Sequence, residues 1–195
     1  MISSKITFLT VVAACFIATC SAQIAVLSPC QNVTLEQNFD LSSYAGKWFE
    51  YQRYFTFFQF GGKCVTAYYT PNGTDTITVR NYLVKENTGE VNIILGSATL
   101  VSEVGEGELS LDFPSVGQVD QDYWVLGTDY KSFSVVWSCS NSGSDQSLQL
   151  AWLLTRDRVP SSETLALAQE VIDRNGLVDS FMITNQDSCP EDPYP

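Results

Sequence analysis

Ala45-Gly46-Lys47-Trp48-Phe49-Glu50-Tyr51-Gln52-Arg53-Tyr54 is the stretch that decides the fold. The polar residues Glu50 and Gln52 alternate with aromatic neighbours, which is the pattern of a strand with one face toward a core. Gly46 lets the backbone bend tightly where the strand begins. Trp48, just inside the strand, is large enough to plug one end of a closed sheet. A sheet plugged at one end forms a cup.

The sequence between this stretch and residue 155 continues as short apolar runs separated by turn residues such as Pro71-Asn72-Gly73. Such turns favour hairpins between successive strands. Eight antiparallel strands suit a barrel that either fills itself with side chains or holds one small ligand. The pattern leaves a filled orthogonal sandwich open as the alternative. The eight predicted strands are 45–55, 64–70, 74–85, 90–101, 108–113, 122–128, 132–139 and 148–155.

One helix is predicted over 161–176, where a serine N-cap candidate, helical apolar spacing and a final glycine follow Pro160. A single amphipathic helix after eight strands packs on the outside of the sheet. A short strand over 180–184 is expected after it. No linker or repeat interrupts the sequence, so 23–195 is predicted to be one domain.

Residues 1–22 have the pattern of a signal peptide, with Lys5, an apolar stretch and a small-residue cleavage site. Secretion into the extracellular space is therefore expected. The apolar stretch is too short to span a membrane. Loss of Lys5 with the leader takes the formal net charge from −12 to −13, which is unfavourable for binding nucleic acid or an anionic membrane.

Four cysteines remain after the leader is removed, an even number in an oxidising compartment, and two disulfides are expected. The sequence by itself permits three pairings. Two sequons, at Asn32 and Asn72, are candidate glycosylation sites, and Asn72 lies in the more favourable turn.

The chain contains no histidine. This composition removes histidine triads, imidazole metal sites and the usual general base at neutral pH. The acidic residues are scattered and form no calcium-binding loop. We therefore expect neither an enzyme nor a metal protein, and no covalent cofactor.

Three sparse motifs recur in one order: Gly46 with Trp48, then Thr128-Asp129-Tyr130, then Arg156. In this respect the chain resembles the lipocalins, specifically the apolipoprotein D and insect bilin-binding type, over nearly the whole mature sequence. The resemblance implies the eight-stranded barrel with one helix outside. It also implies that the three motifs meet at a closed base, with Arg156 stacked on Trp48 and Asp129 bonding turn amides. Their implied role is structural.

The same resemblance selects two disulfides, Cys30 with Cys139 and Cys64 with Cys189. Both bridges use all four cysteines, so no free thiol is left for pocket chemistry of the prostaglandin synthase type.

The predicted cavity lining combines period-two alternation from Trp48 with the family match. Asn81, Tyr69 and Tyr123 are the polar handles that would orient a ligand; packing in a dry core is the alternative for these residues. The predicted ligand-binding residues are Glu50, Tyr69, Asn81, Leu83, Ile94, Leu111, Phe113, Tyr123, Val136, Leu148, Leu150 and Trp152, and alternation adds Gln52 and Ser138 to the inward face.

The aromatic segment 54–60 follows the first strand, where the family has a large loop beside the open mouth. An apolar loop of this kind suggests a lid, a membrane-touching lip or a partner surface. We favour the lid, with Phe57 and Phe58 as its mouth-loop residues.

These observations predict a secreted carrier of one small hydrophobic molecule. Likeness to the bilin carriers makes biliverdin a candidate, whereas Leu83 and Leu111 at expected polar positions shift the weight toward a lipid: a fatty acid, a sterol or a retinoid. No basic residue falls in the predicted mid-pocket set. The alternative is a lipocalin fold that acts through protein or membrane contact at its Phe-rich loop, with a pocket enzyme as a weaker third. The oligomeric state stays open.

Overall fold

A computed structural model describes residues 24–192, so the predicted leader lies outside the described residues. Ten strands, two helices and two 3-10 turns make up the described part. They are β1 (Ile24–Val26), α1 (Leu41–Tyr44), β2 (Gly46–Arg53), η1 (Phe57–Gln59), β3 (Gly62–Pro71), β4 (Thr76–Lys85), β5 (Val91–Leu100), β6 (Glu108–Phe113), η2 (Pro114–Val116), β7 (Gln118–Thr128), β8 (Phe133–Asn141), β9 (Ser147–Thr155), α2 (Ser162–Arg174) and β10 (Met182–Ile183).

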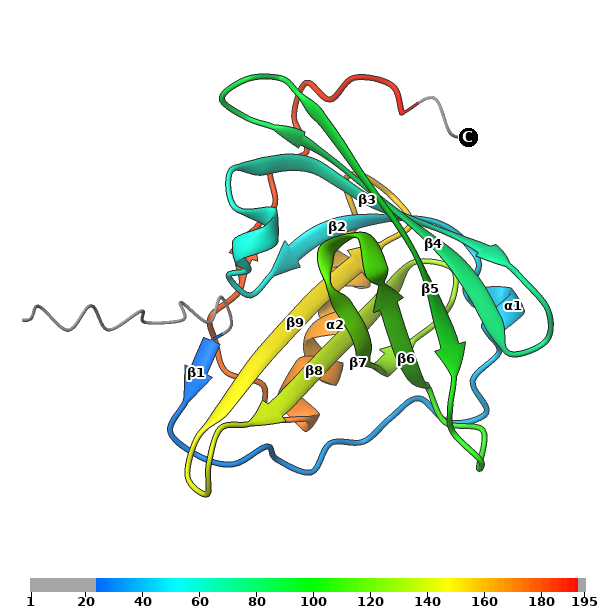
Figure 1. Cartoon of the computed structure of the whole chain (residues 1–195), viewed down its shortest axis with the longest axis vertical. Helices are drawn as coiled ribbons and strands as arrows, with labels where there is room; N and C mark the ends of the chain where they lie inside the picture. The colour runs from blue at the N-terminus through cyan, green and yellow to red at the C-terminus, as the bar shows by residue number, and fades with distance from the viewer. Residues whose placement is uncertain (1–23, 193–195) are drawn as a thin grey trace, which may run out of the picture.

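Strands β2 to β9 pair antiparallel in sequence order, and β9 pairs back with β2. This closure confirms the predicted eight-stranded barrel and rules out the filled sandwich (Figure 1). The short strands β1 and β10 extend the sheet on β9 and β2. Among the described residues, no helix is long and apolar enough to cross a membrane.

The predicted strand boundaries lie within two residues of the observed ones except at the start of β7. Strand β7 begins at Gln118 rather than 122, and β3 begins at Gly62 rather than 64. Both early starts lie beside bulges, Leu111/Phe113 and Lys63/Thr66, where pairing continues past an irregular register. Because a bulge breaks the period of two, alternation stops predicting the strand there.

Helix α2 lies outside the barrel, as predicted, and Figure 1 shows it behind β8 and β9. The hydroxyl of Ser161 accepts a hydrogen bond from the Thr164 amide at 3.1 Å and caps the first turn. Ala168, Val171 and Ile172 bury the apolar face of the helix in a cluster with β7, β8 and β9. The cluster thus gives the barrel wall a second core on its outer side.

Strand β2 contains a bulge between Glu50 and Gln52, which corrects the prediction that Gln52 faces inward. Gln52 pairs with Leu153, which packs in the outer cluster, whereas Arg53 pairs with the cavity residue Trp152. The extra residue reverses the facing of everything after Glu50. An arginine is thereby placed on the inner face of the wall, where it is 5% exposed.

Two disulfides tie the ends of the described chain to the barrel, with the pairings that the resemblance implied. Cys30 joins Cys139 of β8, and Cys64 of β3 joins Cys189 of the C-terminal segment. The bridges span 109 and 125 residues. Each therefore closes a loop of more than half the chain.

Candidate functional site

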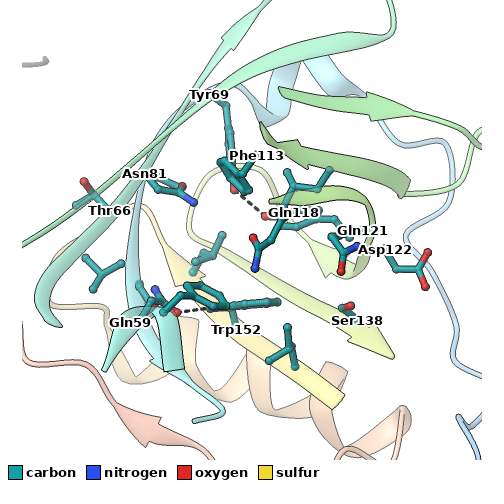
Figure 2. A pocket seen from close by; sticks show the side chains of 18 residues that line it. Gln59, Thr66, Tyr69, Asn81, Phe113, Gln118, Gln121, Asp122, Ser138 and Trp152 are labelled. Atoms are coloured by element: carbon teal, nitrogen blue, oxygen red, sulfur yellow. Dashed lines mark hydrogen bonds between the residues drawn. The ribbon is translucent and has the colours of Figure 1, made fainter. Parts of the chain in front are cut away.

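The inside of the barrel contains a cavity of about 240 Å³ and an adjoining one of about 100 Å³. Together they reach the lower end of the range of about 300 to 1,000 Å³ typical of small-molecule sites. Figure 2 shows the side chains converging on this space from β3, β4, β6, β7 and β9. Within the described part of the chain, neither cavity is lined by a lysine or an arginine.

Most of the predicted lining residues surround these cavities, although their role in binding stays a prediction. The larger cavity is lined by Glu50, Tyr69, Asn81, Leu111, Phe113, Tyr123, Ser138, Leu150 and Trp152, and the smaller one by Asn81, Leu83, Ile94 and Phe113. Two predicted residues line neither cavity. Val136 is fully buried in the barrel core, and Leu148 is half-buried on β9.

Several residues that line the cavities were not predicted from the sequence. They are Gln59, Val65, Thr66, Ala67, Asn92, Val116, Gln118, Gln121, Asp122 and Leu154, together with Tyr82 at the smaller cavity. Gly96 was not predicted either, although it makes room for the ring of Phe113, because an added Cβ at Gly96 would lie 2.4 Å from that ring. Strand alternation carries no signal for η1 and η2, which are not strands. The bulge in β3 hides Thr66, whereas Val65 and Ala67 follow the alternation back from Tyr69 and could have been predicted from it.

The closed base of the barrel is built on an aromatic column. The Arg156 guanidinium lies 3.7 Å from the Trp48 ring centroid, and it donates to the carbonyls of Lys47 at 2.8 Å and Ala45 at 2.9 Å. Trp48 contacts Tyr44 with 5.3 Å between ring centroids. Gly46 makes the tight entry possible, with φ +95° in the left-handed half of the map that favours glycine.

The turn between β7 and β8 is fixed by Asp129. Its carboxylate accepts hydrogen bonds from the amides of Lys131, Ser132 and Phe133 at 2.7 to 3.1 Å. The Tyr130 carbonyl at the same turn accepts from Arg156 at 3.0 Å, and the Thr128 hydroxyl accepts from the Tyr130 amide at 2.9 Å. The three sequence motifs therefore meet at one end of the barrel.

Arg156→Ala should lower the free energy of unfolding by about 2 kcal/mol, because it removes the cation-π contact with Trp48 and the hydrogen bonds that the guanidinium donates to five backbone carbonyls. For a chain of this size the midpoint of thermal unfolding should fall by about 4 to 8 °C. Ligand affinity, measured well below the midpoint, should change little, because Arg156 lies beneath the cavity floor. A collapse of affinity with unchanged stability would make Arg156 a ligand residue. Arg156→Lys is the matched control that keeps the charge and loses the fork of donors.

A buried polar cluster lies at the cavity wall next to the mouth loop. The Glu50 carboxylate, 2% exposed, accepts from Thr184 at 2.5 Å, Gln59 at 2.6 Å and Arg53 at 3.2 Å. Arg53 also donates to the Gln59 carbonyl at 3.3 Å. Burial raises the pKa of Glu50, while Arg53 and the three donors oppose that rise. The cluster joins β2 to η1 and to the C-terminal segment.

The mouth loop is held to the barrel by Gln59 rather than by its phenylalanines. The Gln59 side chain is 7% exposed, donates to Glu50 and accepts from the Trp152 indole at 3.3 Å (Figure 2). Phe58 lines both cavities, whereas Phe57 is 65% exposed. The two phenylalanines therefore face different surroundings, although both were predicted as mouth-loop residues.

Phe58→Ser should speed release of a bound ligand about fivefold, because it removes partly buried apolar area worth about 1 kcal/mol from the cavity wall. Phe57→Ser is the matched control and should leave the release rate unchanged. Stopped-flow displacement of a fluorescent ligand measures both rates. Equal release rates for the two variants and the unmodified protein would contradict a lid role for the loop.

An antiparallel barrel closed at its base, with an internal cavity and a polar-anchored mouth loop, defines the class of small-molecule binding barrels. The family model described as Lipocalin / cytosolic fatty-acid binding protein family matches residues 45–188. The chain belongs to the lipocalin family.

The chain is similar to the Lazarillo protein of Schistocerca americana, with 37% identity over 78% of this chain and 71% of that protein. It is 32% identical to apolipoprotein D of Macaca fascicularis, over 85% of this chain and 86% of the relative. The solved structure of insecticyanin from the tobacco hornworm Manduca sexta covers 84% of this chain and 89% of its own, with a TM-score of 0.73 at 25% identity. The predicted likeness to the apolipoprotein D and bilin-binding type is confirmed.

The matched family is described by fatty-acid binding, and bilin-binding protein of Pieris brassicae, to which this chain is also related, is named for its ligand. The expectation that this chain is a binding protein and not an enzyme rests on that relationship.

Proposed function

We propose that the protein is a secreted carrier that holds one small, largely apolar molecule in its barrel cavity. The observation that carries this proposal is the enclosed cavity itself. Apolar and aromatic side chains form most of its wall, Trp48 closes its base and Phe58 covers its mouth. Burial of apolar ligand surface at about 25 cal/mol per Å² supplies the affinity.

Secretion is supported by the two disulfides, because such bridges persist in oxidising compartments. The predicted leader agrees with this compartment. Asn32 and Asn72 are both exposed, which makes both sequons accessible to glycosylation in the secretory pathway.

The ligand class is narrowed by the lining. Leu83 and Leu111 stand where polar partners of a tetrapyrrole would be expected, and they favour a fatty acid, sterol or retinoid over a bilin such as biliverdin. Bilin stays a candidate because of the likeness to bilin-binding protein. Native mass spectrometry and an absorbance spectrum of protein purified from its source distinguish these classes, because a pigment absorbs visible light and a saturated lipid does not.

Entry of a bilin or a retinoid into the barrel should quench the fluorescence of Trp152, whose ring lines the cavity. The chain has four tryptophans, so Trp152→Phe is the control that assigns the signal.

Leu150→Asn should weaken binding about tenfold through lost apolar contact and an unpaired amide in the wall. A protein that refuses every hydrophobic ligand after delipidation would contradict the carrier function.

Exposed apolar residues outside the cavity favour a second candidate function, contact with a membrane or another protein. Phe57 is 65% exposed, Phe60 is 64% exposed and Ile183 is 72% exposed. Cosedimentation with uncharged phosphatidylcholine vesicles tests the membrane form, since the acidic chain is repelled by anionic lipid. Loss of cosedimentation in Phe57→Ser, with ligand release unchanged, would support this second function.

A further inference from the structure

Two phenol side chains lie at the floor of the cavity. The aromatic column at the base continues from Tyr44 to Tyr69, whose rings stack with 5.4 Å between centroids and 20° between planes. Tyr69 of β3 and Tyr123 of β7 both line the cavity, and their hydroxyls are 2.7 Å apart. Figure 2 shows Tyr69 reaching into the cavity with this hydrogen bond at its tip.

These phenols belong to a row of four hydroxyls that runs out of the cavity into the core. Tyr123 lies 3.2 Å from the Tyr44 hydroxyl, which in turn lies 2.9 Å from the Ser134 hydroxyl. Ser134 is fully buried, and among the described residues Tyr44 is the partner of its hydroxyl. The row therefore has one end in the core and the other in the cavity.

Counting protons along the row fixes its direction. Four hydroxyls carry four protons, while the row contains three hydrogen bonds, so one proton is left without a partner. If that proton were on Ser134 or on Tyr44, which are both fully buried and line neither cavity, it would be unsatisfied, which is costly. The row is therefore polarised from Ser134 toward the cavity, and the remaining proton lies on Tyr69 or Tyr123, where a ligand or water can accept it.

The surrounding charges favour an acceptor at this point. Burial raises the pKa of Tyr44 to about 12 and holds the pKa values of Tyr69 and Tyr123 well above their ordinary value, so all three stay neutral donors at physiological pH. Beneath them, the hydrogen bonds of Arg156 within the described chain all go to backbone carbonyls. Its positive charge acts on Tyr44 and Tyr69 and is partly offset by the Asp129 carboxylate, so it adds a modest attraction for negative potential on a ligand atom above the floor.

A carboxylate is a poorer match than a carbonyl. One phenolic donor does not replace the water shell of an ionised group, and desolvating a carboxylate without full pairing is unfavourable. The acidic residues Glu50 and Asp122 also line the cavity, and the described residues that line it include no basic side chain. A neutral oxygen needs only the one donor that the floor supplies.

We propose that Tyr69 and Tyr123 form a hydrogen-bond donor subsite at the cavity floor, which selects a neutral carbonyl-bearing ligand and orients it oxygen-first toward the base. This inference rests on the proposed carrier function and deepens it. The apolar remainder of the ligand then lies along Leu111, Leu150 and Trp152 toward the mouth. The selected class is an apolar ketone, aldehyde or ester.

The test compares octan-2-one with octane, which differ by the carbonyl oxygen, as competitors for N-phenyl-1-naphthylamine bound in the barrel. The variants are Tyr69→Phe, Tyr123→Phe and the double variant. Each single variant keeps one phenolic proton facing the cavity, so its selectivity for the ketone over the alkane should remain close to that of the unmodified protein. The double variant has none, and its ketone-to-alkane affinity ratio should fall about tenfold.

An infrared readout separates ligand recognition from a merely structural role of the phenols. The carbonyl stretch of ¹³C-labelled octan-2-one should lie at lower wavenumber in the unmodified protein than in alkane solvent, and this shift should vanish in the double variant. Thermal unfolding of each variant identifies the temperature below which the comparison is valid. Phenylalanine is nearly isosteric with tyrosine, so the cavity shape is retained.

Three results would overturn the subsite. The first is an unchanged ketone-to-alkane ratio in the folded double variant, and the second is an unshifted carbonyl stretch in the unmodified protein. The third is octanoate binding more tightly than octan-2-one at neutral pH, which would make the floor an anion site. If the unmodified protein binds neither N-phenyl-1-naphthylamine nor octan-2-one nor octane, the carrier function itself fails, and that outcome is distinct from the three above.

Discussion

Glu50→Ala should lower the free energy of unfolding by about 3 to 5 kcal/mol, the largest single effect that we expect. The substitution leaves the Arg53 guanidinium buried without its counter-charge, and it removes the acceptor of Gln59 and Thr184. Because Gln59 holds the mouth loop to the barrel, retention of a bound ligand should fall as well. Urea unfolding monitored by tryptophan fluorescence measures the stability, and displacement kinetics measure the retention.

A double substitution separates the ion pair from the space that it fills. Glu50→Leu with Arg53→Met removes both charges, and it should recover much of the loss, because a buried pair replaced by apolar side chains is often neutral. Recovery of stability without recovery of ligand retention would show that the hydrogen bonds of Gln59, rather than the ion pair, hold the mouth loop to the barrel. If the Glu50→Ala variant were as stable as the unmodified protein, the stabilising role of the buried Glu50–Arg53 pair would be contradicted.

The pH dependence of this cluster has a definite sign. Burial raises the pKa of Glu50 above its ordinary value of 4.5, so between 4.5 and the raised pKa the folded state binds more protons than the unfolded state. The contribution of Glu50 to stability therefore rises as the pH falls from neutral toward 4.5, and it is lost as the pH rises through the raised pKa. Arg53 is the charged group that faces Glu50.

Glu50→Gln is the reference for this titration because it keeps the shape and cannot ionise. The free energy of unfolding of the unmodified protein minus that of Glu50→Gln should increase as the pH is lowered from 7 to 4.5. A difference that decreases over the same interval would mean that Arg53 and the hydrogen bonds outweigh burial.

Loss of the Cys64–Cys189 disulfide should cost about 2 to 5 kcal/mol, the second largest effect. The bridge closes a loop spanning 125 residues, and it holds the C-terminal segment that places Thr184 on Glu50. Cys64→Ser with Cys189→Ser should therefore lower the denaturation midpoint and also loosen the buried cluster. Urea unfolding and hydrogen exchange of the Thr184 amide, which donates to the Tyr51 carbonyl at 2.9 Å, measure the two consequences.

The matched control is removal of the Cys30–Cys139 disulfide. Its loop spans 109 residues, so the chain-entropy cost should be nearly the same, whereas the Glu50 cluster should be unaffected. Peptide mapping without reduction checks both pairings in the unmodified protein. Recovery of Cys30 linked to Cys64 would contradict both.

The mouth loop shows why some of the site escaped prediction. Segment 54–60 has the composition of a lid, but composition does not distinguish Phe57, which faces solvent, from Phe58, which lines the cavity. Gln59 gave no signal, because a glutamine in an aromatic loop is ordinarily solvated. Its importance depends on two neighbours, Glu50, which alternation already placed inward, and Arg53, which the bulge in β2 turns to the same side.

The sequence by itself determined the eight strands and the external helix, because these depend on local signals: the alternation within strands, the turn residues between them and the cap at Ser161. The closed barrel and its base followed from the resemblance to the lipocalins, which rests on the sparse motifs at Trp48, Asp129 and Arg156. The tertiary structure alone decided that Tyr44, Tyr69, Tyr123 and Ser134 form one row of hydroxyls, and that the β2 bulge turns Arg53 inward. The physical reason is that hydrogen bonds between distant strands depend on register, and a single bulge changes register without leaving a mark in the local sequence.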